Sequence, residues 1–149
     1  MIYELNPNDN SAIFSYLNAL VEYYRIDNSI VNPQQMNDAV DLMKGCISYS
    51  RFNDERFQFI MAMILTGAGR NAEAALAFEG LMQYRNPDGT STSLISENEL
   101  IFSIGESYYN AGNLNKAEEC FNRLQSMGAG VENASIMLKK IVLKRSGIR

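Results

Sequence analysis

The stretch Glu99–Leu124, ELIFSIGESYYNAGNLNKAEECFNRL, decides the fold of this chain. It reads as two short helices joined by a turn at Gly112 and Asn113. Small and large side chains alternate at the positions where the two helices must touch: Ile101, Ile104, Gly105 and Tyr108 in the first, and Ala117, Phe121 and Leu124 in the second. A small residue lets two helices approach closely, and a large one fills the groove beside it. The stretch therefore predicts an α-helical hairpin.

The composition of the whole chain is that of one soluble helical domain. Its 149 residues are 46% hydrophobic and 20% charged, with three prolines and no tryptophan, which favours helices and argues against disorder. A formal charge of −4 disfavours binding to nucleic acid. No apolar run approaches the roughly 20 residues of a membrane span, and no secretory signal opens the chain, so we expect a cytoplasmic protein without stable membrane insertion. Cys46 and Cys120 are expected to be small core residues of a reducing compartment.

Capping residues and glycines predict where the helices begin and end. Hydrophobic periodicity predicts a first helix over about 11–25. Asn32-Pro33, Asp54 and Asn71 are expected to start the second, third and fourth helices, and Ser96 with Glu99 forms a capping box for the fifth. The remaining predicted elements are a Ser/Thr-rich loop over 85–96, a sixth helix over 114–127 and a last helix over 131–145 that offers Ile136, Met137, Ile141 and Val142 for packing.

The chain contains an internal repeat. A shift of 43 positions lays seven residues of the opening stretch on residues of the same size class. The pairs are Gly112 on Gly69, Ala117 on Ala74, Phe121 on Phe78, Leu124 on Leu81, Ile104 on Met61, Gly105 on Ala62 and Tyr108 on Leu65. Such self-similarity is the signature of stacked helical hairpins.

These residues resemble the tetratricopeptide repeat, whose consensus is 34 residues long. The second copy, 98–131, matches closely. The first, 55–88, departs at Gln58, where a large apolar residue is usual, and the proline near the repeat end is displaced to Pro87 or replaced by Ala129. The resemblance implies an all-α, right-handed stack of two to three hairpins in one domain. The expected parts are a loose arm over 1–10, a divergent hairpin over 11–50, the two repeats and a capping helix over 131–146.

A narrower resemblance covers RFQFIMAMILTGAGRNAEAALAFEGLM, which is similar to the central repeat of the type III secretion translocator chaperones of bacteria. The matching elements are Arg56-Phe57, Gly69, Ala74, Phe78 and Met82, followed by Gly105-Glu106-Ser107, Gly112 and Ala117-Glu118 in the next repeat. The inserted loop and the N-terminal hairpin depart from that family. The resemblance implies a cytoplasmic chaperone that keeps a hydrophobic translocator subunit soluble before export.

Little in the sequence suggests catalysis. There is no histidine, which excludes histidine-based acid–base chemistry and histidine-ligated zinc. Gly67-Ala68-Gly69 lacks the lysine and the preceding strand of a phosphate-binding loop. Adjacent carboxylates such as Glu118-Glu119 point to different helix faces and are read as solvated charge. We therefore expect a non-enzymatic protein with neither cofactor nor metal.

Binding to another protein is better supported. In tetratricopeptide folds the first helix of each hairpin lines a concave groove. Carried over by position, the groove residues are Arg56, Phe59, Met63 and Thr66 in the first copy and Glu99, Phe102, Glu106 and Tyr109 in the second. An alternative is that Phe59, Met63 and Phe102 pack on neighbouring hairpins or on the terminal helix. An apolar groove with a few polar anchors suits an extended peptide.

Charge is unevenly distributed. Residues 131–149 hold five of the 13 basic residues and one of the 17 acidic ones. Basic residues in a last turn stabilise the helix C-terminus, and they could also dock an acidic partner or the chain's own acidic surface. The expected function is to hold a protein or peptide client in the groove. The alternative is a structural adaptor or self-associating subunit of a larger assembly, for which a homodimer is open.

Overall fold

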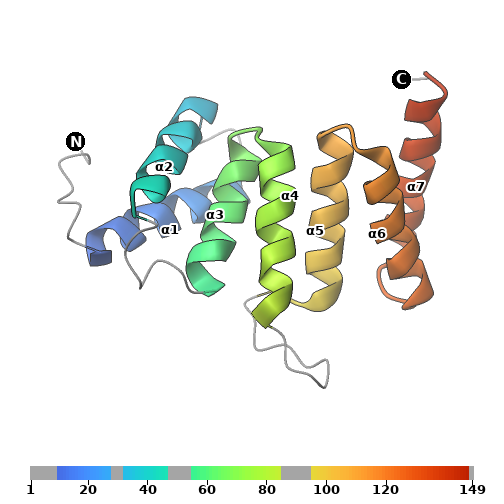
Figure 1. The fold of residues 1–149 in the computed structure, drawn as a ribbon, viewed down its shortest axis with the longest axis horizontal. Helices are drawn as coiled ribbons and strands as arrows, with labels where there is room; N and C mark the ends of the chain where they lie inside the picture. Colours follow the sequence, from blue (N-terminus) through green and yellow to red (C-terminus); the bar gives the residue numbers. More distant parts are fainter. Residues whose placement is uncertain (1–9, 28–31, 47–54, 85–94, 148–149) are drawn as a thin grey trace. The chain divides into compact units, whose positions relative to one another are not determined.

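The chain is all-α. The computed structural model describes residues 10–27, 32–46, 55–84 and 95–147, and in these ranges it contains helices and turns but no strand (Figure 1). The elements are α1 (Asn10–Ile26), α2 (Pro33–Cys46), α3 (Glu55–Gly67), α4 (Asn71–Gly80), the 3-10 turn η2 (Leu81–Tyr84), α5 (Glu97–Asn110), α6 (Leu114–Ser126) and α7 (Val131–Arg145). The predicted fold class is confirmed. None of the described helices has the length and apolar content needed to cross a bilayer.

The chain divides into two compact units, Met1–Arg70 and Asn71–Arg149. The division falls inside the predicted first repeat, because α3 belongs to the first unit and α4 to the second. The pairing of these two helices as a hairpin, and the single domain built from it, stay predictions. The loose arm over 1–10 and the loop over 85–96 lie almost entirely outside the described residues.

Local side-chain caps begin the helices where the sequence predicts. The Asn32 side-chain oxygen accepts a hydrogen bond from the Gln35 backbone N–H at 2.8 Å, and the Gln35 side chain accepts one from the Asn32 N–H at 3.2 Å. The Ser96 hydroxyl accepts from the Glu99 N–H at 3.3 Å. Each bond satisfies a donor that the helix itself cannot.

Two starts differ from the prediction or cannot be compared. Asn71 is the first residue of α4 and not its cap, so this helix begins one position early. Asp54 lies outside the described residues. The fourth helix also ends sooner than its apolar stripe suggests, because Gly80 closes α4 and the chain continues as the tighter turn η2.

The internal repeat is visible in the backbone of two turns. Gly69 and Gly112, which are 43 positions apart, both adopt the left-handed conformation, with φ of +76° and +88°. The residue after each glycine donates its N–H to a carbonyl of the preceding helix: Arg70 to Leu65 and Asn113 to Tyr108, both at 2.9 Å. This is the glycine-dependent helix ending that both copies predict.

The first unit packs α3 against α1 and α2. Its fully buried large side chains come from all three helices, and they are Ile13, Leu17, Met36, Met43, Ile60 and Ile64. Periodic apolar residues on each helix therefore meet in one core.

In the second unit each helix packs on the next, α4 on α5, α5 on α6 and α6 on α7, and successive helices run in opposite directions (Figure 1). The closest approach is at Gly105. A Cβ atom there would lie 2.8 Å from Phe121 Cζ and 2.9 Å from Cys120 Cβ. No side chain larger than hydrogen fits without displacing α6.

The predicted repeat positions are core positions. Ala62, Ala74, Phe78 and Leu81 are buried, and so are the equivalent residues Gly105, Ala117, Phe121 and Leu124. Leu65 and Tyr108 are also buried. Only Met61 is half-buried where its counterpart Ile104 is buried. The size of the side chains at the repeat positions therefore identifies the side of each helix that packs against its neighbours.

The last helix corrects one prediction. Met137 and Ile141 are buried as expected, but Ile136 is 47% exposed and Val142 is 59% exposed. The reason is that α7 packs on α6 and α5 from one side only, so apolar residues on its other side meet no helix among those described.

Candidate functional site

The predicted groove residues of the second copy share one face of α5. Their spacing of three, four and three positions stacks Glu99, Phe102, Glu106 and Tyr109 along the helix. Glu99 and Glu106 are exposed, while Phe102 and Tyr109 are half-buried. We call these four residues the groove face of α5. Two accessible aromatic rings therefore alternate with two carboxylates.

Phe102 is held by the core. Its ring meets the buried Phe121 ring edge-on, with centroids 5.4 Å apart and planes at 65°. This is the preferred geometry of an aromatic pair. Phe102 therefore packs on another helix, as the alternative interpretation expects. Its partner is α6 of the same predicted hairpin, however, and not a neighbouring hairpin or α7.

Tyr109 lies at the border between α5 and α7. Lys144 places its Nζ 4.4 Å from the centre of the Tyr109 ring. The groove face of α5 therefore continues toward the last helix. Lys144 is a basic neighbour of the face that sequence reasoning did not single out.

The first copy's groove residues lie on α3. Arg56 is exposed, and Phe59, Met63 and Thr66 are half-buried between the buried positions of that helix. The Thr66 hydroxyl donates to the Ala62 carbonyl at 2.8 Å, within the helix. Because α3 and α5 belong to different units, the joining of the two sets into one groove stays a prediction.

The last helix, which the sequence analysis treats as a cap, begins at the spacing of one more repeat. The second unit has α5 beginning at Glu97 and α7 at Val131, a separation of one 34-residue consensus repeat. The same shift carries Phe102, Glu106 and Tyr109 onto Ile136, Lys140 and Leu143. All three residues of α7 are exposed, Ile136 by 47% and Leu143 by 45%. The repeat length applied once more along the sequence would have found them.

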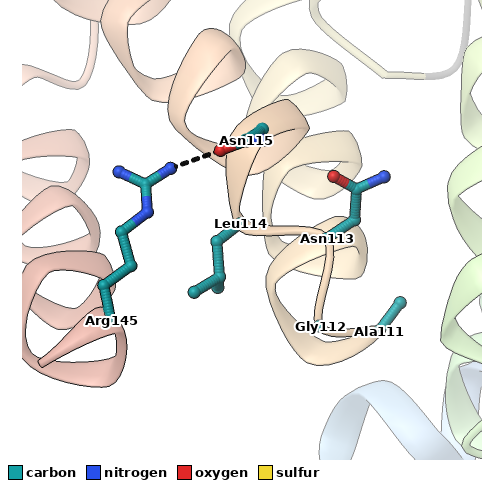
Figure 2. Close-up of a pocket in the computed structure, with 6 residues that line it drawn as sticks. All are labelled: Ala111, Gly112, Asn113, Leu114, Asn115 and Arg145. Atoms are coloured by element: carbon teal, nitrogen blue, oxygen red, sulfur yellow. Dashed lines mark hydrogen bonds between the residues drawn. The ribbon is translucent and has the colours of Figure 1, made fainter. Parts of the chain in front are cut away.

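A polar pocket of about 550 Å3 lies where the α5–α6 turn faces the end of α7, lined by Ala111, Gly112, Asn113, Leu114, Asn115 and Arg145 (Figure 2). Arg145 reaches from α7 toward Asn115 and donates to its side-chain oxygen at 2.7 Å. The other guanidinium nitrogen pairs with Glu118 at 2.6 Å. These contacts of Arg145 join α7 to α6 across the pocket.

Tyr108, Glu79 and Cys120 form a polar cluster in the second unit, in which Tyr108 is buried, Cys120 is half-buried and Glu79 is exposed. The Tyr108 hydroxyl donates to Glu79, and burial together with this bond raises the pKa of Tyr108 to about 12. Burial raises the pKa of the Cys120 thiol to about 11, with a further contribution from Glu79. A thiol reacts as its thiolate, so Cys120 is unreactive at neutral pH. Among the described residues no group of three or more histidine, cysteine or carboxylate side chains is placed to hold a metal ion.

Comparison of the chain with protein-family models, with curated proteins and with solved structures gives no match. The tetratricopeptide resemblance and the narrower resemblance to secretion chaperones therefore rest on the residues quoted for them. The contacts and exposed surfaces of the second unit are the main evidence about function.

Proposed function

We propose that this chain is a non-enzymatic protein-binding module that holds an extended segment of a partner against the groove face of α5. The observation that supports it is the pair Phe102 and Tyr109. Both rings keep accessible surface on a helix whose other large side chains are buried, and each has an exposed carboxylate beside it. Aromatic rings with polar neighbours are typical of surfaces that bind peptides.

The contacts of the two rings favour binding at low entropic cost. Phe102 is fixed by its edge-on contact with Phe121, and Tyr109 by the cation above its ring. A side chain that is already ordered loses little freedom when a partner arrives. The exposed Glu99 and Glu106 favour a partner segment with apolar residues that fit beside the rings and basic residues near the carboxylates.

The narrower resemblance suggests the client. We infer a hydrophobic translocator subunit that is kept soluble and unassembled in a bacterial cytoplasm, with the chain acting as its chaperone. The alternative is a structural adaptor or self-associating subunit of a larger assembly. The exposed apolar residues of α7 are the observation that favours the alternative.

The proposal is tested in two steps. A pull-down from the native host with mass spectrometry identifies what co-purifies, where one dominant hydrophobic protein favours the chaperone and several subunits of one assembly favour the adaptor. Binding of the purified client is then measured by calorimetry for Tyr109→Ala and Phe59→Ala. We expect both substitutions to abolish binding. The melting temperature should stay nearly unchanged in Phe59→Ala, and in Tyr109→Ala it should fall only by what the contact with Lys144 contributes.

Two further variants act as references. Tyr23→Ala removes an exposed ring on α1, a helix that carries none of the groove residues, and should leave binding unchanged. Phe121→Ala removes a fully buried ring and should lower the free energy of unfolding by about 3–5 kcal/mol. If Tyr109→Ala unfolds the chain as Phe121→Ala does, the groove residues are core and the proposal is wrong. Wild-type binding by Tyr109→Ala would also overturn it.

A further inference from the structure

The last helix is apolar on two neighbouring sides. Ala134, Met137 and Ile141 are buried on the side that packs against the rest of the second unit. The next side around the helix carries Leu138, Lys139, Val142 and Leu143, which line an apolar pocket of about 410 Å3. We call these four residues the open face of α7. A helix with apolar residues on both sides is normally buried on both.

The register of α7 indicates what shape would cover this face. The helix starts one 34-residue repeat after α5, so Lys139 and Val142 are equivalent to Gly105 and Tyr108. On α5 these two positions face α6. A Cβ atom at Gly105 would lie 2.8 Å from Phe121 Cζ, and the Lys116 Nζ lies 5.1 Å from the Tyr108 ring centre. The open face of α7 therefore corresponds to the side of α5 that a helix covers. Because Lys139 stands where α5 has Gly105, a helix on this face would lie further from α7 than α6 lies from α5.

Charge indicates the chemistry of that helix. Residues 131–145 carry four basic side chains and one acidic one. Arg145 pairs with Glu118, and Lys144 lies over Tyr109. Lys139 and Lys140 are exposed and form no ion pair within the described part of the chain. Lys139 lines the apolar pocket, and its cation complements a carboxylate beside an apolar stripe.

The same charges disfavour two other occupants. A second copy docked through the same face would bring two Lys139 side chains together, which repel. A bilayer surface binds basic helices whose charged and apolar residues lie on separate faces, whereas the open face of α7 has Lys139 among its apolar residues. We propose that the open face of α7 docks an amphipathic helix of another protein, with acidic residues flanking its apolar stripe. This surface includes Leu143, the repeat equivalent of Tyr109, but none of the four residues of the groove face of α5, so the proposal does not depend on binding there.

The test uses the full chain and a synthetic helical peptide of about three heptads, with leucine and isoleucine at the a and d positions, glutamate at e and g, and one tryptophan. Because the chain has no tryptophan, the fluorescence anisotropy of the peptide reports binding without background. We expect saturable binding that weakens more than about tenfold in Val142→Glu. Leu76→Glu, at an apolar residue that is exposed to a similar extent, is the matched control and should bind as wild type.

Charge reversal provides a second variant that leaves the apolar residues intact. Lys139→Glu should weaken binding of the glutamate peptide and strengthen binding of a peptide with lysine at the e and g positions. The proposal is overturned if the wild-type chain binds neither peptide, or if Leu76→Glu weakens binding as much as Val142→Glu. It is also overturned if Val142→Glu instead abolishes co-sedimentation with phosphatidylserine vesicles, or dissociates a homodimer in analytical ultracentrifugation.

Discussion

Lys144 contacts Tyr109 twice, through the face of the ring and through the backbone. Its Nζ lies 4.4 Å from the ring centre and 3.4 Å from the Tyr109 carbonyl oxygen. That carbonyl belongs to the last turn of α5, where cations are favourable. One side chain in the last turn of α7 therefore joins the end of α5 to the terminal helix.

We expect Lys144→Ala to lower the free energy of unfolding by about 0.5–1 kcal/mol, the usual contribution of an exposed cation–π contact. Lys140→Ala, one turn earlier on the same helix and without a contact of this kind, should have no measurable effect. Urea denaturation followed by circular dichroism checks both. Equal destabilisation by the two variants would show that the contact with Tyr109 contributes nothing.

Gly105→Ala should destabilise the chain by about 1–3 kcal/mol, although alanine is the better helix former. The reason is the approach of α6, which leaves 2.8 Å between the new Cβ and Phe121 Cζ. Glu106→Ala, at the exposed next position, is the control for helix propensity. Denaturation of Gly105→Ala in a Phe121→Leu background should show a smaller penalty, because the shorter side chain makes room. An additive double variant would contradict the steric explanation.

Stability should fall at alkaline pH because of two groups, the buried Tyr108 and the half-buried Cys120. Burial raises the pKa of Cys120 from 9.0 to about 11 and the pKa of Tyr108 from 10.0 to about 12. Above the lower value of each pair the unfolded chain has released a proton that the folded chain still holds. The free energy of unfolding then decreases as pH rises, from about 9 for the thiol and about 10 for the phenol. Below pH 9 neither group should contribute a slope.

Substituting Cys120 and Tyr108 in turn shows how much of the pH dependence of stability each group causes. Cys120→Ala should flatten the decrease that begins near pH 9, and Tyr108→Phe the decrease that begins near pH 10. Tyr108→Phe should also cost about 1 kcal/mol at neutral pH, since its hydrogen bond to Glu79 is lost. Urea midpoints at a series of pH values up to about 11 provide the measurement. An unchanged slope in both variants would show that other groups cause the alkaline loss.

Gln58→Leu should stabilise the chain by about 1–2 kcal/mol. The Gln58 side-chain oxygen is buried and has no hydrogen-bond partner among the described residues, and such an atom loses its hydration without compensation. Gln125→Leu should instead destabilise the chain. The Gln125 side-chain amide donates a hydrogen bond to the Ser135 hydroxyl at 2.8 Å, and the substitution removes it. Thermal denaturation that ranks the two variants in the reverse order would refute this account.

The parts of the fold that the sequence predicts are those decided within a few residues. The Asn32, Ser96 and Asn113 caps each bond a backbone N–H three positions along, so residue type and spacing are enough to find them. Glycine in a left-handed turn is equally local. The predicted cap at Asn71 was wrong by one position, because asparagine is favoured at a helix cap but is not restricted to it.

The parts that could not be predicted depend on contacts across the chain. Tyr108 and Glu79 are 29 positions apart, and Arg145 and Glu118 are 27 apart. No pattern in the sequence pairs them. Apolar periodicity also does not say how many sides of a helix are covered, which is why Val142 was expected in the core. Of the candidate site, position on a helix face was predictable, but the neighbours that hold Phe102 and Tyr109 were not.

The turns at Gly69 and Gly112 restrict the chirality of the residue that can occupy them. At Gly69 and Gly112 an added Cβ atom would meet nothing within 4 Å, yet φ is positive at both. An L-residue there is penalised by its own backbone, at about 1–2 kcal/mol, and by no neighbour. A D-alanine would keep the turn and remove freedom from the unfolded chain. Chirality, and not volume, is what these two positions select.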